Sequence, residues 1–213
     1  MKYDVRNVPE RRTQEERRGE AERRLIEAAA AMVSEAGPAK VTLANVGERA
    51  GYSRGLASHH FGSKRALMQR LVESVTYQFR EALFDQTESG DALGELGILV
   101  GIYFDVVSDL QPINRARLVL WADAVANPSD DVRPAMLNAD QEFREEIEKR
   151  LRQAIVTGQV PDTVNAHGLA TVIIAMLRGV ALQSLIDNHV DLAAARFEIE
   201  QLLLARLRKE SRQ

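Results

Sequence analysis

The stretch "VTLANVGERAGYSRGLASHHFGSKRALM", residues 41–68, decides how the chain is interpreted. Thr42 precedes an apolar helical face and is placed to cap a short helix. Gly51 permits the positive φ of a tight turn, and Ser53 is placed to cap a second helix over about residues 54–60. Two short helices joined by a tight turn are typical of a helix-turn-helix, whose second helix enters the major groove of DNA.

The second helix carries side chains suited to DNA. Arg54 offers the paired donors that recognise guanine, the commonest specific contact in the major groove. Lys64 stands at a helix start, where phosphates are bound, and Gly55 lets the backbone approach DNA closely. The candidate DNA-binding residues are Thr42, Ser53, Arg54, Gly55, Ser58, His59, His60 and Lys64.

The pair His59-His60 has two other interpretations, a metal site and a catalytic pair. Adjacent helical residues point about 100° apart, and the chain has no cysteine to complete a metal site. A catalytic pair lacks a placed nucleophile. Contact with an anionic surface therefore fits the two histidines best, and we expect no metal, no catalytic residue and no cofactor.

The same stretch resembles the DNA-binding signature of the TetR family of bacterial repressors. The matching positions are Thr42, Glu48-Arg49-Ala50-Gly51, Ser53, His60-Phe61 and Lys64. The chain departs from the family pattern at Leu56, Ala57 and Ser58, where threonine, leucine and tyrosine are common, so the base preference of other members does not transfer. The resemblance implies an all-α fold, a homodimer formed by the last two helices, and a ligand pocket among the middle helices.

Composition agrees with a helical protein of two parts. Residues 1–70 carry 14 Lys and Arg against 9 Asp and Glu, and the remainder carries 14 against 22, so the N-terminal part is basic and the rest acidic. Strand-like alternation is absent and helical periodicity recurs throughout. We expect an all-α protein with a flexible basic arm (1–12), a helix-turn-helix domain (13–68) and a domain for ligand binding and dimerisation (69–213).

The cellular location of the protein is inferred from two features that we do not find in the sequence, a membrane span and a signal peptide. The longest apolar run, residues 168–177, is too short to span a membrane and is closed by Arg178. The N-terminus has no apolar core of the kind found in signal peptides. A cytoplasmic protein without a membrane partner is therefore expected.

The acidic part has apolar helical patterns over about 164–188 and 192–209, and these are the expected dimer helices. The candidate pocket residues are Tyr103, Phe104, Asp105, Trp121, Asp123, Met136, His167 and Met176. Asp105 and Asp123 interrupt apolar runs, and a buried carboxylate needs a partner. That partner is either a cationic ligand or a nearby arginine such as Arg115 or Arg117. The segment "RLVLWADAVANP" loosely resembles choline-responsive members of the family.

Three functions remain open at this point. The leading hypothesis is a ligand-responsive repressor that binds a palindromic operator as a homodimer and is released by an unknown small-molecule effector. A DNA-binding regulator controlled by a protein partner is the second. A helical-bundle enzyme is the third, although the sequence has no HExxH, GxGxxG or P-loop motif.

Overall fold

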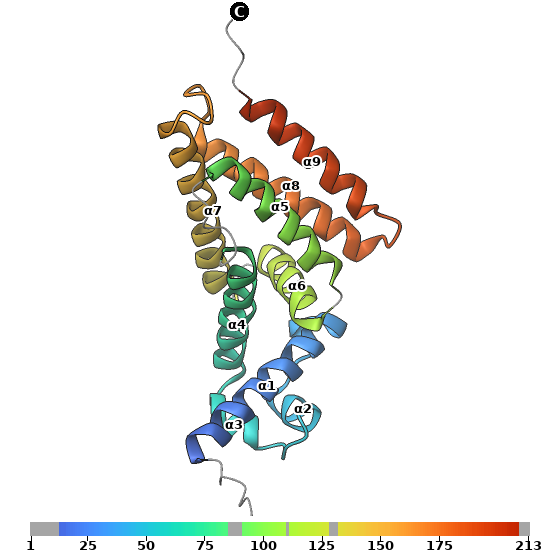
Figure 1. Ribbon diagram of the computed structural model, residues 1–213. Helices are drawn as coiled ribbons and strands as arrows, with labels where there is room; N and C mark the ends of the chain where they lie inside the picture. The colour runs from blue at the N-terminus through green and yellow to red at the C-terminus, as the bar shows by residue number, and fades with distance from the viewer. Residues whose placement is uncertain (1–12, 85–90, 110, 128–131, 209–213) are drawn as a thin grey trace, which may run out of the picture.

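The computed structural model describes residues 13–84, 91–109, 111–127 and 132–208, and it shows an all-α protein (Figure 1). The predicted fold class is confirmed. The predicted arm, residues 1–12, lies outside the described residues. The elements are α1 (Gln14–Ala36), the 3-10 turn η1 (Pro38–Lys40), α2 (Leu43–Arg49), α3 (Leu56–Phe61), α4 (Lys64–Phe84), α5 (Ala92–Ser108), α6 (Pro112–Ala126), α7 (Arg133–Val156), α8 (Ala166–Ile186) and α9 (Leu192–Leu207).

Helix boundaries follow local capping chemistry. Thr13 and Glu16 form the predicted capping box at the start of α1. At the other end of α1, Gly37 adopts a φ of 77° and stops the helix. At the start of α4, the hydroxyl of Ser63 accepts a hydrogen bond from the backbone N–H of Ala66 at 3.1 Å. These side chains satisfy backbone groups that a helix end leaves unpaired.

The helices enclose two hydrophobic cores. In Figure 1, α1, α2 and α3 lie at the bottom, α5, α8 and α9 lie at the top, and α4 rises from the lower group toward the upper one. The upper core is built on residues such as Phe79, Leu99, Tyr103, Phe104, Ile147, Leu151, Ile173 and Leu177. The lower core contains Leu25, Ala29, Val33, Val46, Ala57, Leu67, Leu71, Ala116, Leu120 and Met136. Because α6 and α7 supply its last three residues, this core reaches beyond residues 13–68.

Among the described residues, α8 is the one helix long and apolar enough to cross a membrane by length and composition alone. A single helix of this kind is weak evidence for a span, because core helices of soluble proteins pass the same test. Ile173, Leu177 and Ala181 of α8 are buried in the upper core. Within the same helix, Arg178 forms an ion pair with Asp140 of α7. We therefore interpret α8 as a packing helix.

The turn between α2 and α3 gives a direct test of local backbone geometry. Gly51 has a φ of 80°, and no neighbouring atom lies within 4 Å of the place where a Cβ would stand. Gly51→Ala should therefore lower the free energy of unfolding by about 1–2 kcal/mol through the left-handed backbone alone. Thermal unfolding followed by circular dichroism measures this loss.

Gly19→Ala is the matched control for that substitution. Gly19 lies inside α1, also has open space around its missing Cβ, and has no left-handed backbone. Alanine there should raise stability by up to about 1 kcal/mol, because alanine favours a helix over glycine. If both variants shifted the unfolding temperature in the same direction, the conformational explanation for Gly51 would be wrong.

Candidate functional site

Helices α2 and α3 form a helix-turn-helix. The hydroxyl of Thr42 caps α2 by accepting a hydrogen bond from the Asn45 N–H at 3.2 Å, as predicted. The turn is closed by backbone hydrogen bonds from Gly51 to Glu48 at 3.0 Å and from Tyr52 to Gly47 at 2.9 Å. This network fixes how α3 projects from the lower group of helices.

The start of α3 differs from the prediction. The helix begins at Leu56, and no side chain caps it. The Ser53 side chain was expected to cap a helix from about residue 54, and this expectation is wrong. Instead, the Ser53 backbone carbonyl accepts a hydrogen bond from the Leu56 N–H at 3.1 Å. Arg54 and Gly55 therefore lie in the turn that leads into α3.

The structure brings the predicted DNA-binding side chains to one end of the molecule. Ser53, Arg54, Gly55, Ser58 and His59 are exposed, while His60 and Lys64 are partly buried. Ala57 is completely buried in the lower core, so its small side chain packs beneath α3 instead of facing solvent. The exposed side of α3 and its preceding turn is thus polar, and no element of the described ranges covers it.

Arg54 holds an exposed position that favours contact with a partner. Its side chain is 71% exposed, and its Nε lies 2.6 Å from a carboxylate oxygen of Glu48. An exposed ion pair of this kind contributes little to stability. The guanidinium can therefore exchange Glu48 for another acceptor at small cost.

Two other basic residues of this region have structural contacts. Lys64 Nζ donates a hydrogen bond to the Ala39 carbonyl at 3.1 Å, which ties α4 to η1. Arg49 donates to Glu35 at 2.7 Å and so joins α2 to the last turn of α1. This hydrogen bond holds the pKa of the Glu35 carboxyl below its usual value. Arg49 thus helps to orient α2 through its contact with Glu35 of α1.

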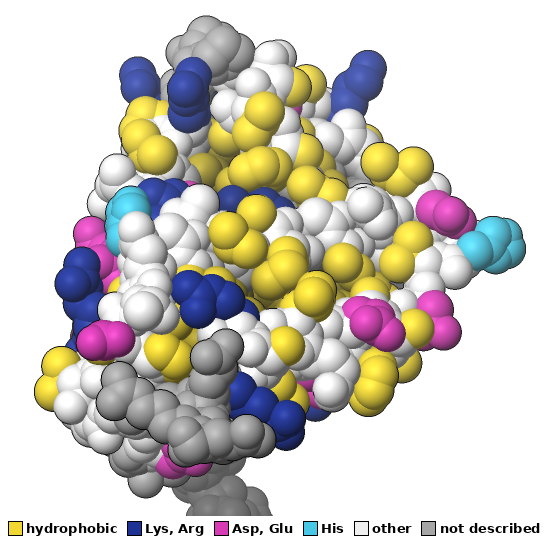
Figure 2. Space-filling model, turned by 90° about the horizontal axis from the view of Figure 1, so that it is seen from above, with side chains coloured by type: hydrophobic (Ala, Val, Ile, Leu, Met, Phe, Trp, Pro, Cys, Tyr) yellow, Lys and Arg dark blue, Asp and Glu magenta, His cyan; other side chains and the backbone are white. Residues whose placement is uncertain are grey.

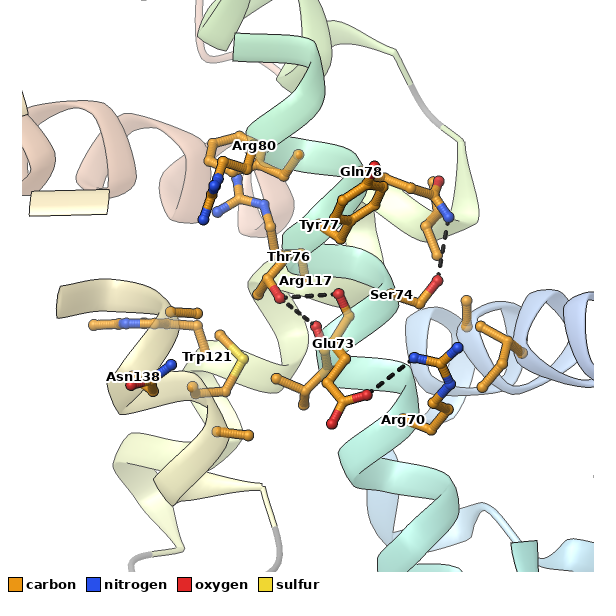
Figure 3. A pocket seen from close by; sticks show the side chains of 18 of the residues that line it. Arg70, Glu73, Ser74, Thr76, Tyr77, Gln78, Arg80, Arg117, Trp121 and Asn138 are labelled. Carbon is orange, nitrogen blue, oxygen red and sulfur yellow. Dashed lines mark hydrogen bonds and ion pairs between the residues drawn. The ribbon is translucent and has the colours of Figure 1, made fainter. Parts of the chain in front are cut away.

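A cleft of about 1290 Å³ lies between α1, α4, α6 and α7 (Figure 3). Of the predicted pocket residues, Trp121 and Met136 line it. The other six lie elsewhere. Tyr103 and Phe104 are buried in the upper core, and Met176 packs against it. His167 is largely exposed and lies 2.9 Å from Glu148.

The two aspartates predicted to be buried are not cleft residues. Asp105 is 74% exposed and pairs with Arg196 of α9 at 3.5 Å, so its expected burial is wrong. Asp123 accepts a hydrogen bond from the Asn127 side chain at 2.8 Å, one turn further along the chain. Neither carboxylate is therefore placed to hold a cation in this cleft.

Arg117, by contrast, is a buried cation on the cleft wall. Its side chain comes from α6 and lies beside α4 in Figure 3, and the residue is only 7% exposed. The guanidinium carbon lies 3.5 Å from the centroid of the Phe79 ring. Burial lowers the pKa of Arg117, and Tyr103 opposes this shift with a smaller effect. A guanidinium nevertheless keeps its charge in proteins.

From the sequence alone, Arg117 is only a possible partner for an aspartate. The apolar run around it, "RARLVLWA", was the available signal that a buried cation lies in this helix. A second arginine, Arg178, lies over the Trp121 ring at 4.4 Å and pairs with Asp140, which also binds Arg144 at 2.6 Å. Trp121 therefore packs against a cation from α8, and Asp140 of α7 holds that cation in place.

The short α2 and α3 pair, with an exposed polar face and a helical body behind it, defines a helix-turn-helix DNA-binding protein. A sequence profile described as "Bacterial regulatory proteins, tetR family" matches residues 25–71. A second profile, "BetI-type transcriptional repressor, C-terminal", matches residues 103–209, which is half of the chain. The chain therefore belongs to the TetR family of transcriptional regulators, with a C-terminal domain of the BetI type, and is not an enzyme.

Curated relatives and solved structures agree with this assignment. The HTH-type transcriptional regulators BetI of Escherichia coli O139:H28 and of Shigella flexneri serotype 5b are each 29% identical over 140 residues, covering 62% of this chain and 72% of the relative. A TetR regulator from Chloroflexus aurantiacus J-10-FL superposes with a TM-score of 0.81 at 18% identity, covering 91% of this chain and 99% of its own.

Two further structures hold ligands. A regulator from Saccharomonospora viridis in complex with choline has a TM-score of 0.78 at 20% identity, covering 90% of this chain and 100% of its own. The SmeT–triclosan complex, of the repressor from Stenotrophomonas maltophilia, has a TM-score of 0.77 at 21% identity, covering 90% of this chain and 93% of its own. At these identities the likeness shows the shared fold.

Proposed function

We propose that the protein is a ligand-responsive repressor that binds a palindromic operator as a homodimer in the cytoplasm. The observation that carries this proposal is the uncovered polar face of α3 and its preceding turn, which offers donors and acceptors of the kind that read base edges. We assign contacts with bases to Arg54, Ser58 and His59. Contacts with the phosphate backbone are assigned to Thr42, Ser53, Gly55, His60 and Lys64.

A second copy of the chain is the proposed partner of α8 and α9. Val172 and Ile186 of α8, and Phe197 and Leu204 of α9, are large apolar side chains that stay exposed in the single chain. Figure 2 looks down on this side and shows hydrophobic side chains gathered across it. A face of this kind marks an interaction site. Pairing two chains there by a two-fold axis would present two copies of α3 to a palindrome.

The cleft is the proposed effector site, because its position couples it to the DNA-binding end. Its walls include residues of α1 and α4, which carry the helix-turn-helix, and residues of α6 and α7 from the body. Since α6 also packs in the lower core, a ligand between these helices would favour one arrangement of α1 and α4 over another. A ligand shifts such an equilibrium by its difference in affinity for the two arrangements. The relatives that bind choline and triclosan support a small-molecule effector.

We also propose a division of the chain into a basic arm (1–12), a DNA-binding domain (13–68) and a body for ligand binding and dimerisation (69–213). The body would then carry both α8 and α9 and most of the cleft wall. Control by a protein partner would need no such cleft, so the cleft favours the small molecule.

Selection of bound sequences from a random duplex pool, at near-physiological salt, tests the proposed function. We expect enrichment of a palindrome whose half-sites lie about one helical turn apart, because each dimer presents two recognition helices. Enrichment of a single unpaired half-site would contradict the homodimer. Absence of any enrichment by the purified protein would contradict sequence-specific repression by this chain alone.

A further inference from the structure

We propose that the cleft binds an amphipathic carboxylate, whose anionic head pairs with Arg117 and whose apolar body lies against the cleft wall. The role of such a ligand as the effector rests on the function proposed above. The binding site itself is argued from the charges and the packing around Arg117.

Arg117 is a buried charge without a counter-ion. It forms no ion pair with any residue in the described part of the chain, and its Nε is completely buried without an acceptor. Its guanidinium lies over the faces of the Phe79 and Tyr103 rings, at 3.5 and 5.7 Å from their centroids, and neither residue is a carboxylate. A ring face offsets part of the cost of burying a cation, but buried charges are normally paired. The chemistry that would pair with this guanidinium is that of an anion.

The remaining arginines of the cleft, within the described ranges, are already paired. Arg23 binds Glu27 at 2.8 Å, and Arg80 binds Glu142 at 3.4 Å. Arg70 binds both Glu22 and Glu73, and Arg178 binds Asp140. The lining thus holds as many carboxylates as arginines, but every carboxylate has an arginine partner while Arg117 has none.

The exposure and pairing of these charged groups determine the sign of the electrostatic potential at Arg117. The carboxylates of Glu27, Glu73 and Glu142 are at least half exposed, so water screens their fields. Asp140 is largely buried but is bound by two arginines. Arg117 is buried and unpaired, and its field is therefore the least screened in the cleft. A cationic head group would be repelled at this position.

The shape and lining of the cleft define the rest of the ligand. Its apolar wall is formed by Ile26, Val72, Phe79, Ile113, Trp121 and Met136. A planar guanidinium matches a carboxylate through two parallel hydrogen bonds. Together these features favour a molecule with an alkyl or aryl body and one carboxylate.

Trp121 is the only tryptophan of the chain and lines the cleft, so intrinsic fluorescence reports occupancy. The test titrates the full chain, without DNA, with octanoate, octanol and octyltrimethylammonium, which share a body and differ in head group. We expect octanoate to bind at least about tenfold more tightly than the other two, as a charge-assisted pair requires. Equal binding of all three, tighter binding of the cation, or no binding of octanoate would overturn the proposal.

Arg117→Met keeps an unbranched, flexible side chain and removes the charge. We expect this variant to bind octanoate no more tightly than octanol. Arg23→Gln is the matched control, since Arg23 also lines the cleft but is exposed and paired, and the preference for octanoate should survive there. Retention of the preference in Arg117→Met would overturn the assignment. Should that variant fail to fold, the comparison of head groups on the unaltered chain still tests whether the cleft prefers an anion.

Failure of the anion site and failure of the repressor function would give different results. If octanoate binds through Arg117 but leaves operator binding unchanged, the site stands and the ligand response through it fails. If another class of molecule releases the operator and octanoate shows no preference, the repressor function stands and the anion site fails.

Discussion

The double variant Phe197→Glu with Leu204→Glu is expected to be monomeric and to bind its operator at least about 100-fold more weakly. These residues are 56% and 47% exposed in the single chain and stand seven residues apart on α9, so they share one face. In a dimer, the new carboxylates would be buried without partners and would repel their symmetry copies. Losing the second recognition helix removes the gain from linked binding, which is of order 100-fold or more.

Light scattering after size exclusion measures the mass of the variant, and a titration with the selected operator measures its affinity. Val125→Glu on α6 and Val156→Glu on α7 are matched controls, because both residues are more exposed than Phe197 but belong to other helices than α8 and α9. These controls should remain dimeric. A double variant that stayed dimeric would show that α9 does not form the interface, since replacing exposed side chains leaves the fold of the single chain intact.

Local features of the fold could be predicted from the sequence because short-range chemistry determines them. A threonine placed before an apolar helical run satisfies free N–H groups whatever surrounds it, and Thr13 and Thr42 both cap their helices. Gly51 adopts the positive φ that a tight turn needs. The family likewise followed from residues close together in the chain, between Thr42 and Lys64.

The cleft could not be predicted in the same way, because it depends on how distant helices pack. Asp105 interrupts an apolar run, yet it faces solvent and Arg196, since the buried side of α5 is set by α7, α8 and α9. Arg117 also borders an apolar run, yet its side chain is buried. Periodicity does not distinguish the two residues, because each is a charged residue that borders an apolar helical run. Only the placement of α6 against α4 shows which charge is buried.

Arg54→Ala should weaken binding to the selected operator by about 1–3 kcal/mol, or roughly fivefold to 150-fold, and relax specificity at one base pair of each half-site. The reason is that Arg54 offers two parallel donors, and the group it leaves on binding is only an exposed Glu48. Binding is measured against the operator and against duplexes changed at single positions, at constant salt. The mutation should leave the unfolding temperature nearly unchanged, because exposed ion pairs add little stability.

Lys64→Ala provides the contrast, because its proposed contact is with a phosphate. We expect it to weaken binding to all sequences by similar factors and to reduce the slope of log affinity against log salt by about one unit. Since Lys64 also binds the Ala39 carbonyl, its unfolding temperature must be compared with that of the unaltered chain. If Arg54→Ala and Lys64→Ala lost affinity equally on every duplex, Arg54 would be a backbone contact. Sequence reading would then belong to Ser58 and His59, the remaining exposed polar side chains proposed to contact bases from α3.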